Sequence, residues 1–132
     1  MNREILFRGK RTDNGEWVYG DLLCNWTVPQ ILSEEDGNEY LVIPATVGQF
    51  TGLTDKNGVK IWEGDIIGDW TDVDGEQVQS TCPVFFEETL GEWMIDVNHG
   101  QEMAMAYSLA SELNDFDYEV IGNIHDNPEL IK

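Results

Sequence analysis

Hydrophobic and polar residues alternate along much of this sequence, in runs that are all short. Alternation with a period of two is the pattern of half-buried β-strands, because neighbouring side chains of a strand point to opposite faces. The runs are 5–7, 16–23, 40–43, 59–62, 66–70, 78–87, 92–97 and 118–124. Many short strands at close spacing predict a small barrel or sandwich of antiparallel strands.

Turn residues separate these runs. The Asn-Gly pair, the strongest local signal for a tight hairpin, occurs at residues 14–15 and again at residues 57–58. A further hairpin is expected around residues 90–91, where the sequence is Leu-Gly. We expect residues 33–39, SEEDGNE, to form an exposed acidic loop, and the polar residues 69–77 to form a connection between strands.

One segment departs from the alternation. Ala106, Leu109, Ala110 and Leu113 follow the spacing i, i+3, i+4, i+7 of one face of a helix. This spacing predicts a helix near residues 102–114 whose apolar face packs on the core. The predicted fold class is therefore mainly β, with α+β at the margin, and it contains one helix.

A length of 132 residues fits one domain that needs neither a metal ion nor a disulfide bond to fold. Within that single domain, residues 1–47 can be set apart as an amino-terminal hairpin region and residues 48–132 as a barrel with its helix. Cys24 and Cys82 belong to no C-x-x-C pair, and we expect two buried thiols, with a bridge between them left open. No long apolar stretch is present, so we expect a soluble, unexported protein that does not enter a membrane.

The balance of charge is abnormal. The chain has 26 Asp and Glu residues against 7 Lys and Arg, a formal net charge of −19. Such a surface repels DNA, RNA and anionic membranes, since Lys and Arg supply most of the affinity for phosphate. We therefore expect no direct contact with nucleic acid or membrane, and partners among basic proteins, cations or copies of the chain itself. We favour the alternative that the acidity only keeps the domain soluble.

Three carboxylates next to tryptophans form the strongest candidate site. Glu63, Asp65 and Asp69 lie beside Trp62 and Trp70, where desolvation raises a carboxyl pKa toward the range of a general acid or base. The alternative, which we favour, is that a Glu-Gly-Asp bend uses its carboxylates to accept hydrogen bonds from turn amides. The sequence thus predicts no catalytic residue, and these five side chains remain candidates for binding.

Metal and nucleophilic sites find less support. The segment 72–75, Asp-Val-Asp-Gly, copies the middle of an EF-hand loop, but Trp70 and Thr81 stand where the first ligand and the bidentate Glu belong. We expect a solvated hairpin loop here, and no metal ion or cofactor. His99 and His125 are isolated in the sequence, which argues against a Ser or Cys nucleophile activated by a base.

Two further features concern association. The chain is rich in aromatic residues, and a surplus beyond the core marks a face for self-association; the set is Trp17, Trp26, Trp62, Trp70 and Trp93 with Tyr19, Tyr40 and Phe50. The amino-terminal hairpin carries the one basic patch, formed by Arg3, Arg8, Lys10 and Arg11. A basic edge on an acidic body favours head-to-tail contact between subunits, which salt should weaken.

Three blocks of residues, in order, span nearly the whole chain. The first has REI and FRGK at residues 3–5 and 7–10; the second has FTGL, DKNG and IWEGDI within residues 50–66; the third has YEVIGNI and NPEL within residues 118–130. With these blocks the sequence resembles the YopX family, small proteins encoded by bacteriophages and prophages of low-GC Gram-positive bacteria. The resemblance implies a β-rich fold with an SH3-like barrel element, cytoplasmic expression during phage growth and assembly as an oligomer. It implies no established activity.

The sequence therefore favours a non-enzymatic phage or prophage protein, a β module that self-associates and contacts host or phage proteins. An alternative is an acidic decoy that mimics the charge of DNA and occupies a host nucleic-acid-binding protein. A third hypothesis, a metal-dependent hydrolase, requires Glu63, Asp65 and Asp69 to converge in one pocket.

Overall fold

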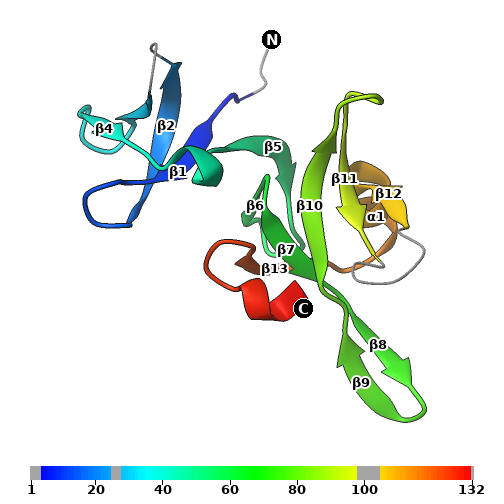
Figure 1. The fold of residues 1–132 in the computed structure, drawn as a ribbon. Helices are drawn as coiled ribbons and strands as arrows, with labels where there is room; N and C mark the ends of the chain where they lie inside the picture. The colour runs from blue at the N-terminus through cyan, green and yellow to red at the C-terminus, as the bar shows by residue number, and fades with distance from the viewer. Residues whose placement is uncertain (1–3, 25–27, 98–104, 132) are drawn as a thin grey trace. The chain divides into compact units, whose positions relative to one another are not determined.

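The computed structural model describes residues 4–24, 28–97 and 105–131, and its strands belong to two units of the chain, Met1–Gly52 and Leu53–Lys132 (Figure 1). Each unit is described by itself. The fold is mainly β with one α-helix, as predicted, and the described strands form antiparallel sheets without a closed barrel. Arg3, Trp26 and His99 lie outside the described residues, as does the start of the predicted helix.

The first unit is an antiparallel meander in which the strands lie in the order β4-β3-β2-β1-β5. Its turn at Asn14-Gly15 is the predicted hairpin: the Arg11 amide donates to the Glu16 carbonyl at 2.9 Å, and Gly15 has a φ of +74°. The acidic loop after Ser33 is also confirmed. The elements are β1 (Phe7–Lys10), β2 (Trp17–Cys24), β3 (Pro29–Ser33), β4 (Glu39–Leu41), the 3-10 turn η1 (Pro44–Thr46) and β5 (Gly48–Thr54).

A small core holds this meander together. Val18, Ile31 and Val42 are buried, and Phe7, Tyr40 and Val47 pack against them. An isolated bridge pairs Arg11 with Val42, which brings the end of β1 back to the residue that follows β4. Close packing at this point requires glycine at position 9, because a Cβ there would lie 2.9 Å from the Val42 Cβ.

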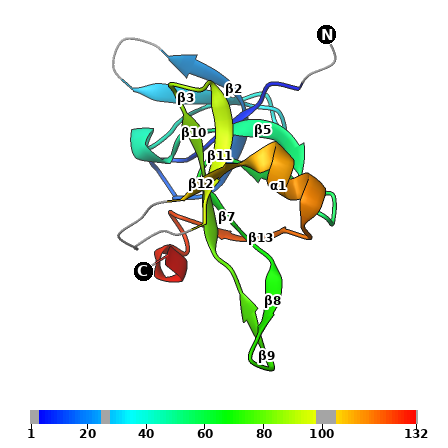
Figure 2. The same ribbon diagram turned by 90° about the vertical axis from the view of Figure 1, so that its right-hand side faces the viewer.

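The second unit contains a five-stranded sheet in the order β12-β11-β10-β7-β13 and a separate two-stranded hairpin, β8–β9 (Figures 1 and 2). The end of β5, Leu53 and Thr54, belongs to this unit, and the neighbour of β5 here is β6. The elements are β6 (Lys60–Trp62), β7 (Asp65–Gly68), β8 (Trp70–Val73), β9 (Glu76–Gln79), β10 (Cys82–Glu87), β11 (Glu92–Asp96), β12 (Ala106–Ser108), α1 (Leu109–Asp115), β13 (Glu119–Asn123) and the 3-10 turn η2 (Pro128–Ile131).

The core of the second unit lies between this sheet and α1, which packs on β11 and β12. Seven buried residues form this core: Ile61, Ile67, Cys82, Val84, Ile95, Leu109 and Tyr118. The hairpins at Asn57-Gly58 and Leu90-Gly91 both form, as the sequence predicted. Cys24 is exposed and Cys82 is buried, and both thiols are free, so the expectation of two buried thiols is wrong for Cys24.

The helix is shorter than predicted. Ala106, which has helical spacing, instead lies in β12 and pairs with Asp96. Ser108 then begins the helix, because its hydroxyl accepts a hydrogen bond from the Ser111 amide, the usual role of an N-cap serine. The helix therefore occupies Leu109–Asp115, and only this part of the predicted segment near 102–114 is helical in the described residues.

The connection predicted for residues 69–77 is wrong, since these residues form most of the β8–β9 hairpin. Asp74 and Gly75 both have positive φ, +52° and +86°, which is the conformation of a two-residue type I′ turn. The strand predicted over 78–87 is interrupted accordingly: β9 ends at Gln79 and β10 begins at Cys82. Polar composition hid these strands, because their side chains are exposed on both faces.

Candidate functional site

The middle sequence block is organised around one buried carboxylate. Asp55 is 7% exposed, and its Oδ1 accepts hydrogen bonds from the amides of Asn57 at 2.8 Å and Val59 at 2.9 Å. Its Oδ2 accepts from the Val120 amide at 2.9 Å, 65 residues along the chain. Asp55 thus closes the Asn-Gly turn and fastens it to β13, which gives this residue a structural role.

The Glu-Gly-Asp bend is built in the same way. Asp65 is 2% exposed, and its Oδ2 accepts from the Trp62 amide at 2.7 Å. Gly64 has a φ of +88°, a conformation that favours glycine, and its amide donates to the Val84 carbonyl at 2.9 Å. Its carbonyl accepts from the Ile124 amide at 2.8 Å. The bend therefore joins β10 and the end of β13, as the hydrogen-bonding interpretation of Asp65 predicts.

The last sequence block folds around two asparagines. The Asn127 Oδ1 accepts from the Asn123 amide at 3.2 Å, and a Cβ on Gly122 would lie 2.6 Å from that same oxygen. The Asn123 Oδ1 accepts from the amides of His125 and Asp126, each at 2.9 Å. The asparagines and the glycine of this block therefore serve its turn and its close packing.

The five candidate binding residues do not form one site. Trp62 and Asp65 are buried and in contact, while Glu63 is half-buried beside them. Asp65 is the first residue of β7 and Asp69 follows its last residue, Gly68, so the two are separated by about 13 Å at the rise of an extended strand. Trp70 is the one of the five that presents a large surface, with 51% of it exposed.

Trp70 belongs to the β8–β9 hairpin (Trp70–Gln79), which carries the most exposed strands of the second unit. Two further apolar side chains of this hairpin are exposed, Val73 at 52% and Val78 at 46%. Its base is fixed by hydrogen bonds between Asp69 and Ser80: the Asp69 amide donates to the Ser80 hydroxyl, and the Ser80 amide donates to the Asp69 carbonyl, each at 2.9 Å. Sequence analysis did not single out the two valines, although the Asp-Gly pair at 74–75 is itself a hairpin signal.

The residues that resemble part of an EF-hand lie at the tip of this hairpin. Asp72 Oδ1 accepts from the Gly75 amide at 2.9 Å, so this carboxylate closes the turn, as the hairpin interpretation predicts. In the described ranges 4–24, 28–97 and 105–131, no group of three or more His, Cys, Asp or Glu side chains is arranged to hold a metal ion.

Charge is distributed unequally along the chain. Seventeen of the 26 Asp and Glu residues lie between residues 61 and 131, a stretch that contains no Lys or Arg. The basic residues of the amino-terminal hairpin make contacts inside the first unit. The guanidinium of Arg8 and the ammonium of Lys10 lie 4.5 and 5.5 Å from the Trp17 ring centroid, and the Arg11 guanidinium lies 4.0 Å from that of Tyr40.

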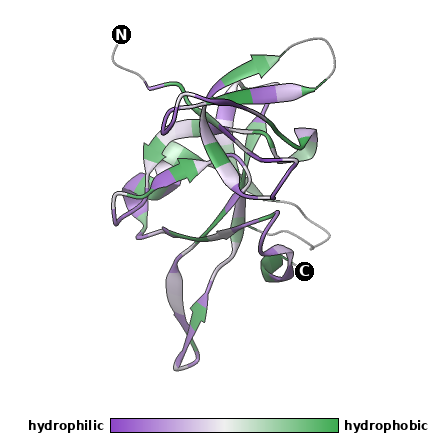
Figure 3. Cartoon of the chain, turned by 90° about the vertical axis from the view of Figure 1, so that its left-hand side faces the viewer, coloured by the Kyte–Doolittle hydropathy of each residue, from purple (hydrophilic) through white to green (hydrophobic). Residues whose placement is uncertain are grey.

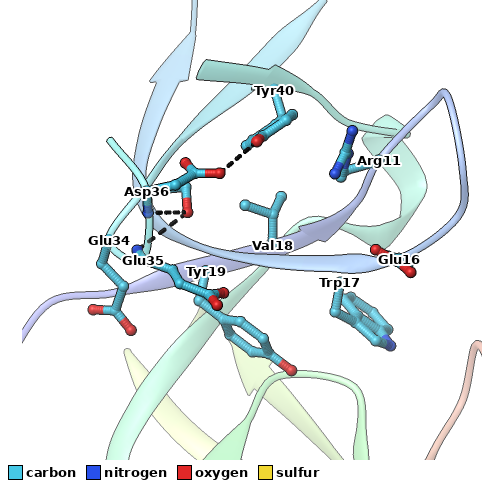
Figure 4. A pocket seen from close by; sticks show the side chains of 10 residues that line it. Arg11, Glu16, Trp17, Val18, Tyr19, Glu34, Glu35, Asp36 and Tyr40 are labelled. Carbon is cyan, nitrogen blue, oxygen red and sulfur yellow. Dashed lines mark hydrogen bonds between the residues drawn. The ribbon is translucent and has the colours of Figure 1, made fainter. Parts of the chain in front are cut away.

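A hollow in the first unit is rimmed by carboxylates and aromatic rings (Figure 4). The Tyr40 hydroxyl donates to Asp36, and this hydrogen bond holds the pKa of the Asp36 carboxyl below its ordinary value. Arg11, on the opposite wall, forms a bidentate pair with Asp13 at 2.9 and 2.6 Å. The hollow encloses about 170 Å³, below the range of about 300–1,000 Å³ for small-molecule pockets. It is lined by Arg11, Glu16, Trp17, Val18, Tyr19, Ser33, Glu34, Glu35, Asp36 and Tyr40.

Known proteins are similar to this chain over nearly its whole length. The family model described as YopX protein matches residues 6–132. Among solved structures, the crystal structure of protein EF1440 from Enterococcus faecalis is similar, with 25% sequence identity and a TM-score of 0.66. The similarity covers 98% of this chain and 99% of that one. A search of curated proteins gave no match. No helix in the described part of the chain has the length and apolar character needed to cross a membrane.

Proposed function

Because the chain belongs to the YopX family, we propose that it is a non-enzymatic phage or prophage protein that self-associates and contacts other proteins. The arrangement of the carboxylates supports a non-enzymatic role. The Asp65 carboxylate accepts a hydrogen bond from the Trp62 amide, and Asp69 lies beyond the far end of β7. A hydrolase that uses Glu63, Asp65 and Asp69 together would need them in one pocket, so this geometry gives that hypothesis no support.

Self-association is supported by one observation, a group of aromatic side chains on the five-stranded sheet, which we define as Phe86, Trp93 and Tyr107; Phe86 and Tyr107 are exposed, whereas Trp93 is partly buried against the core. Phe86 and Trp93 pair across β10 and β11 with ring centroids 4.9 Å apart. Tyr107 pairs with Ile95 and so lies on the same face as Trp93. Phe86 and Tyr107 are 40% and 41% exposed. Clustered aromatic rings on a surface are typical of an interface, because they bury a large apolar area.

Light scattering tests this role directly. We expect the chain to have a mass that is a multiple of its 15.0 kDa. Salt should strengthen an aromatic interface, because it screens the repulsion between acidic copies, whereas it would weaken a head-to-tail contact through the basic hairpin. The double variant Phe86→Thr/Tyr107→Thr should shift the protein toward the single-chain mass. Leu41→Thr changes a comparably exposed side chain of β4 and should have no effect. A single-chain mass for the parent protein at every concentration and salt level would overturn the proposal.

A second candidate function, the acidic decoy of a nucleic-acid-binding protein, is supported by the uninterrupted negative charge of residues 61–131. A decoy competes with nucleic acid for its target. Its test is therefore to capture partners with the tagged chain from host cells and to ask whether added duplex DNA displaces them. A partner that DNA leaves bound would contradict the decoy and remain compatible with the interaction module.

A further inference from the structure

The β8–β9 hairpin is a two-stranded sheet with no core of its own. Figures 1 and 2 show it extending away from the other strands of the second unit. It is the whole of its sheet in the described residues, so the outer edge of each strand has no neighbouring strand. An isolated pair of strands is only marginally stable in water, whereas a third strand that covers an apolar face adds stability. The hairpin is thus an incomplete sheet.

The strand register divides the hairpin into two unlike faces. Thr71 pairs with Val78, and Val73 pairs with Glu76, so one face carries both valines. Trp70 pairs with Gln79, and Asp72 pairs with Gln77, so the other face carries an indole and a carboxylate. Figure 3 shows the resulting mixture of hydrophobic and hydrophilic segments along the hairpin. One face is apolar at its centre and the other suits a cation.

Charge identifies the partner that completes this sheet. The hairpin and its base carry Asp69, Asp72, Asp74 and Glu76, and no Lys or Arg occurs anywhere in residues 61–131. A second copy of the hairpin would bring like charges together within a Debye length, about 8 Å at physiological salt. A strand with Lys or Arg at alternate positions would place one cation beside Asp72 and the next over the ring of Trp70.

We propose that the β8–β9 hairpin binds an extended basic segment of a partner protein, which adds a third strand along the outer edge of β8. This inference rests on the proposed role of the chain as a protein-interaction module. The segment alternates apolar and basic residues. Its apolar side chains pack beside Val73 on β8, which Val78 of β9 supports from the other side on the same face, and its basic side chains meet Trp70 and Asp72. Main-chain hydrogen bonds supply affinity and the alternating side chains supply specificity, as in other cases of strand addition.

The probe is a labelled peptide of about ten residues, the length of a long strand, that alternates lysine and valine. A peptide with serine in place of valine has the same charge and measures the non-specific attraction of an acidic protein. Fluorescence polarisation with the full chain should show the lysine-valine peptide binding at least about ten-fold more tightly than the lysine-serine peptide. Raising the salt concentration should weaken the binding of both peptides.

Matched variants assign the site. Val73→Thr/Val78→Thr keeps the β-branched shape and should remove the preference for the lysine-valine peptide. The control Val28→Thr/Val59→Thr changes two other exposed valines and should preserve that preference. Asp72→Asn retains an oxygen for the Gly75 amide and should weaken both peptides, whereas the exposed control Asp117→Asn should not.

Failure of this inference can be told from failure of the proposed function. Equal affinity of the parent chain for the two peptides, or a preference that survives Val73→Thr/Val78→Thr, would overturn the hairpin site. If the hairpin variant instead lowers the mass measured by light scattering and leaves peptide binding unchanged, a second copy occupies the hairpin. That result would overturn the basic partner and leave self-association standing.

Discussion

Replacing Asp55 tests most sharply whether the middle sequence block is structural. Asp55→Ala removes the acceptor for three amides, those of Asn57, Val59 and Val120. A hydrogen bond to a charged group contributes about 1.5–3 kcal/mol when nothing replaces it. Asn57 and Val59 are exposed, so water takes over most of their loss, whereas Val120 is half-buried. We therefore expect Asp55→Ala to lower the free energy of unfolding by about 3–4 kcal/mol.

Asp55→Asn refines the same test, because it keeps the size of the side chain. Its amide nitrogen must face at least one of the three donors, so we expect a loss of about 2 kcal/mol. Urea unfolding followed by circular dichroism measures both variants. The control Asp117→Asn alters an exposed carboxylate and should stay within about 0.5 kcal/mol of the parent. If Asp55→Ala has the same free energy of unfolding as that control, the structural account of the middle sequence block is wrong.

Three further predictions concern thiols and titrating groups. A thiol reagent at neutral pH should modify Cys24 alone and reach Cys82 only after denaturation, because Cys24 is exposed and Cys82 is buried; modification of both in the native protein would contradict the core. Burial raises the pKa of Cys82 from 9.0 to about 11, so its contribution to stability is complete below pH 9 and is lost as the pH rises toward 11. Urea unfolding at several alkaline pH values should show this decline, and Cys82→Ala should flatten it. Tyr40→Phe removes the hydroxyl that lowers the pKa of Asp36, so NMR titration should find that pKa higher in the variant, and an unchanged value would contradict the contact.

Local turn chemistry explains how much of the fold the sequence predicts. The Asn-Gly pairs at 14–15 and 57–58 each form a hairpin, because glycine at the second position adopts a positive φ without strain. A hairpin loop was expected at residues 72–75, but most of the strands β8 and β9 was missed, since both faces of the hairpin are exposed and its side chains show no alternation of hydrophobic and polar residues. Ala106 has helical spacing but lies in a strand, because its pairing with Asp96 is a contact that spacing does not encode.

In the candidate site, too, local sequence predicts some contacts, whereas others depend on the tertiary structure. The proximity of Trp62 and Asp65 follows from a local bend, and the hydrogen-bonding role of Asp65 could be predicted from it. The bond from Val120 to Asp55 joins residues 65 positions apart, which no local pattern specifies. Trp70 was identified as a candidate by its neighbours in sequence, but its exposure and its place on a projecting hairpin depend on the tertiary structure.

Affinity capture of the tagged full chain from infected host cells, followed by mass spectrometry, tests the central claim most directly. We predict that the tagged chain recovers untagged copies of itself together with a host or phage protein that bears a basic extended segment. Recovery of the tagged chain alone, without a second copy or a partner, would contradict its role as a self-associating interaction module.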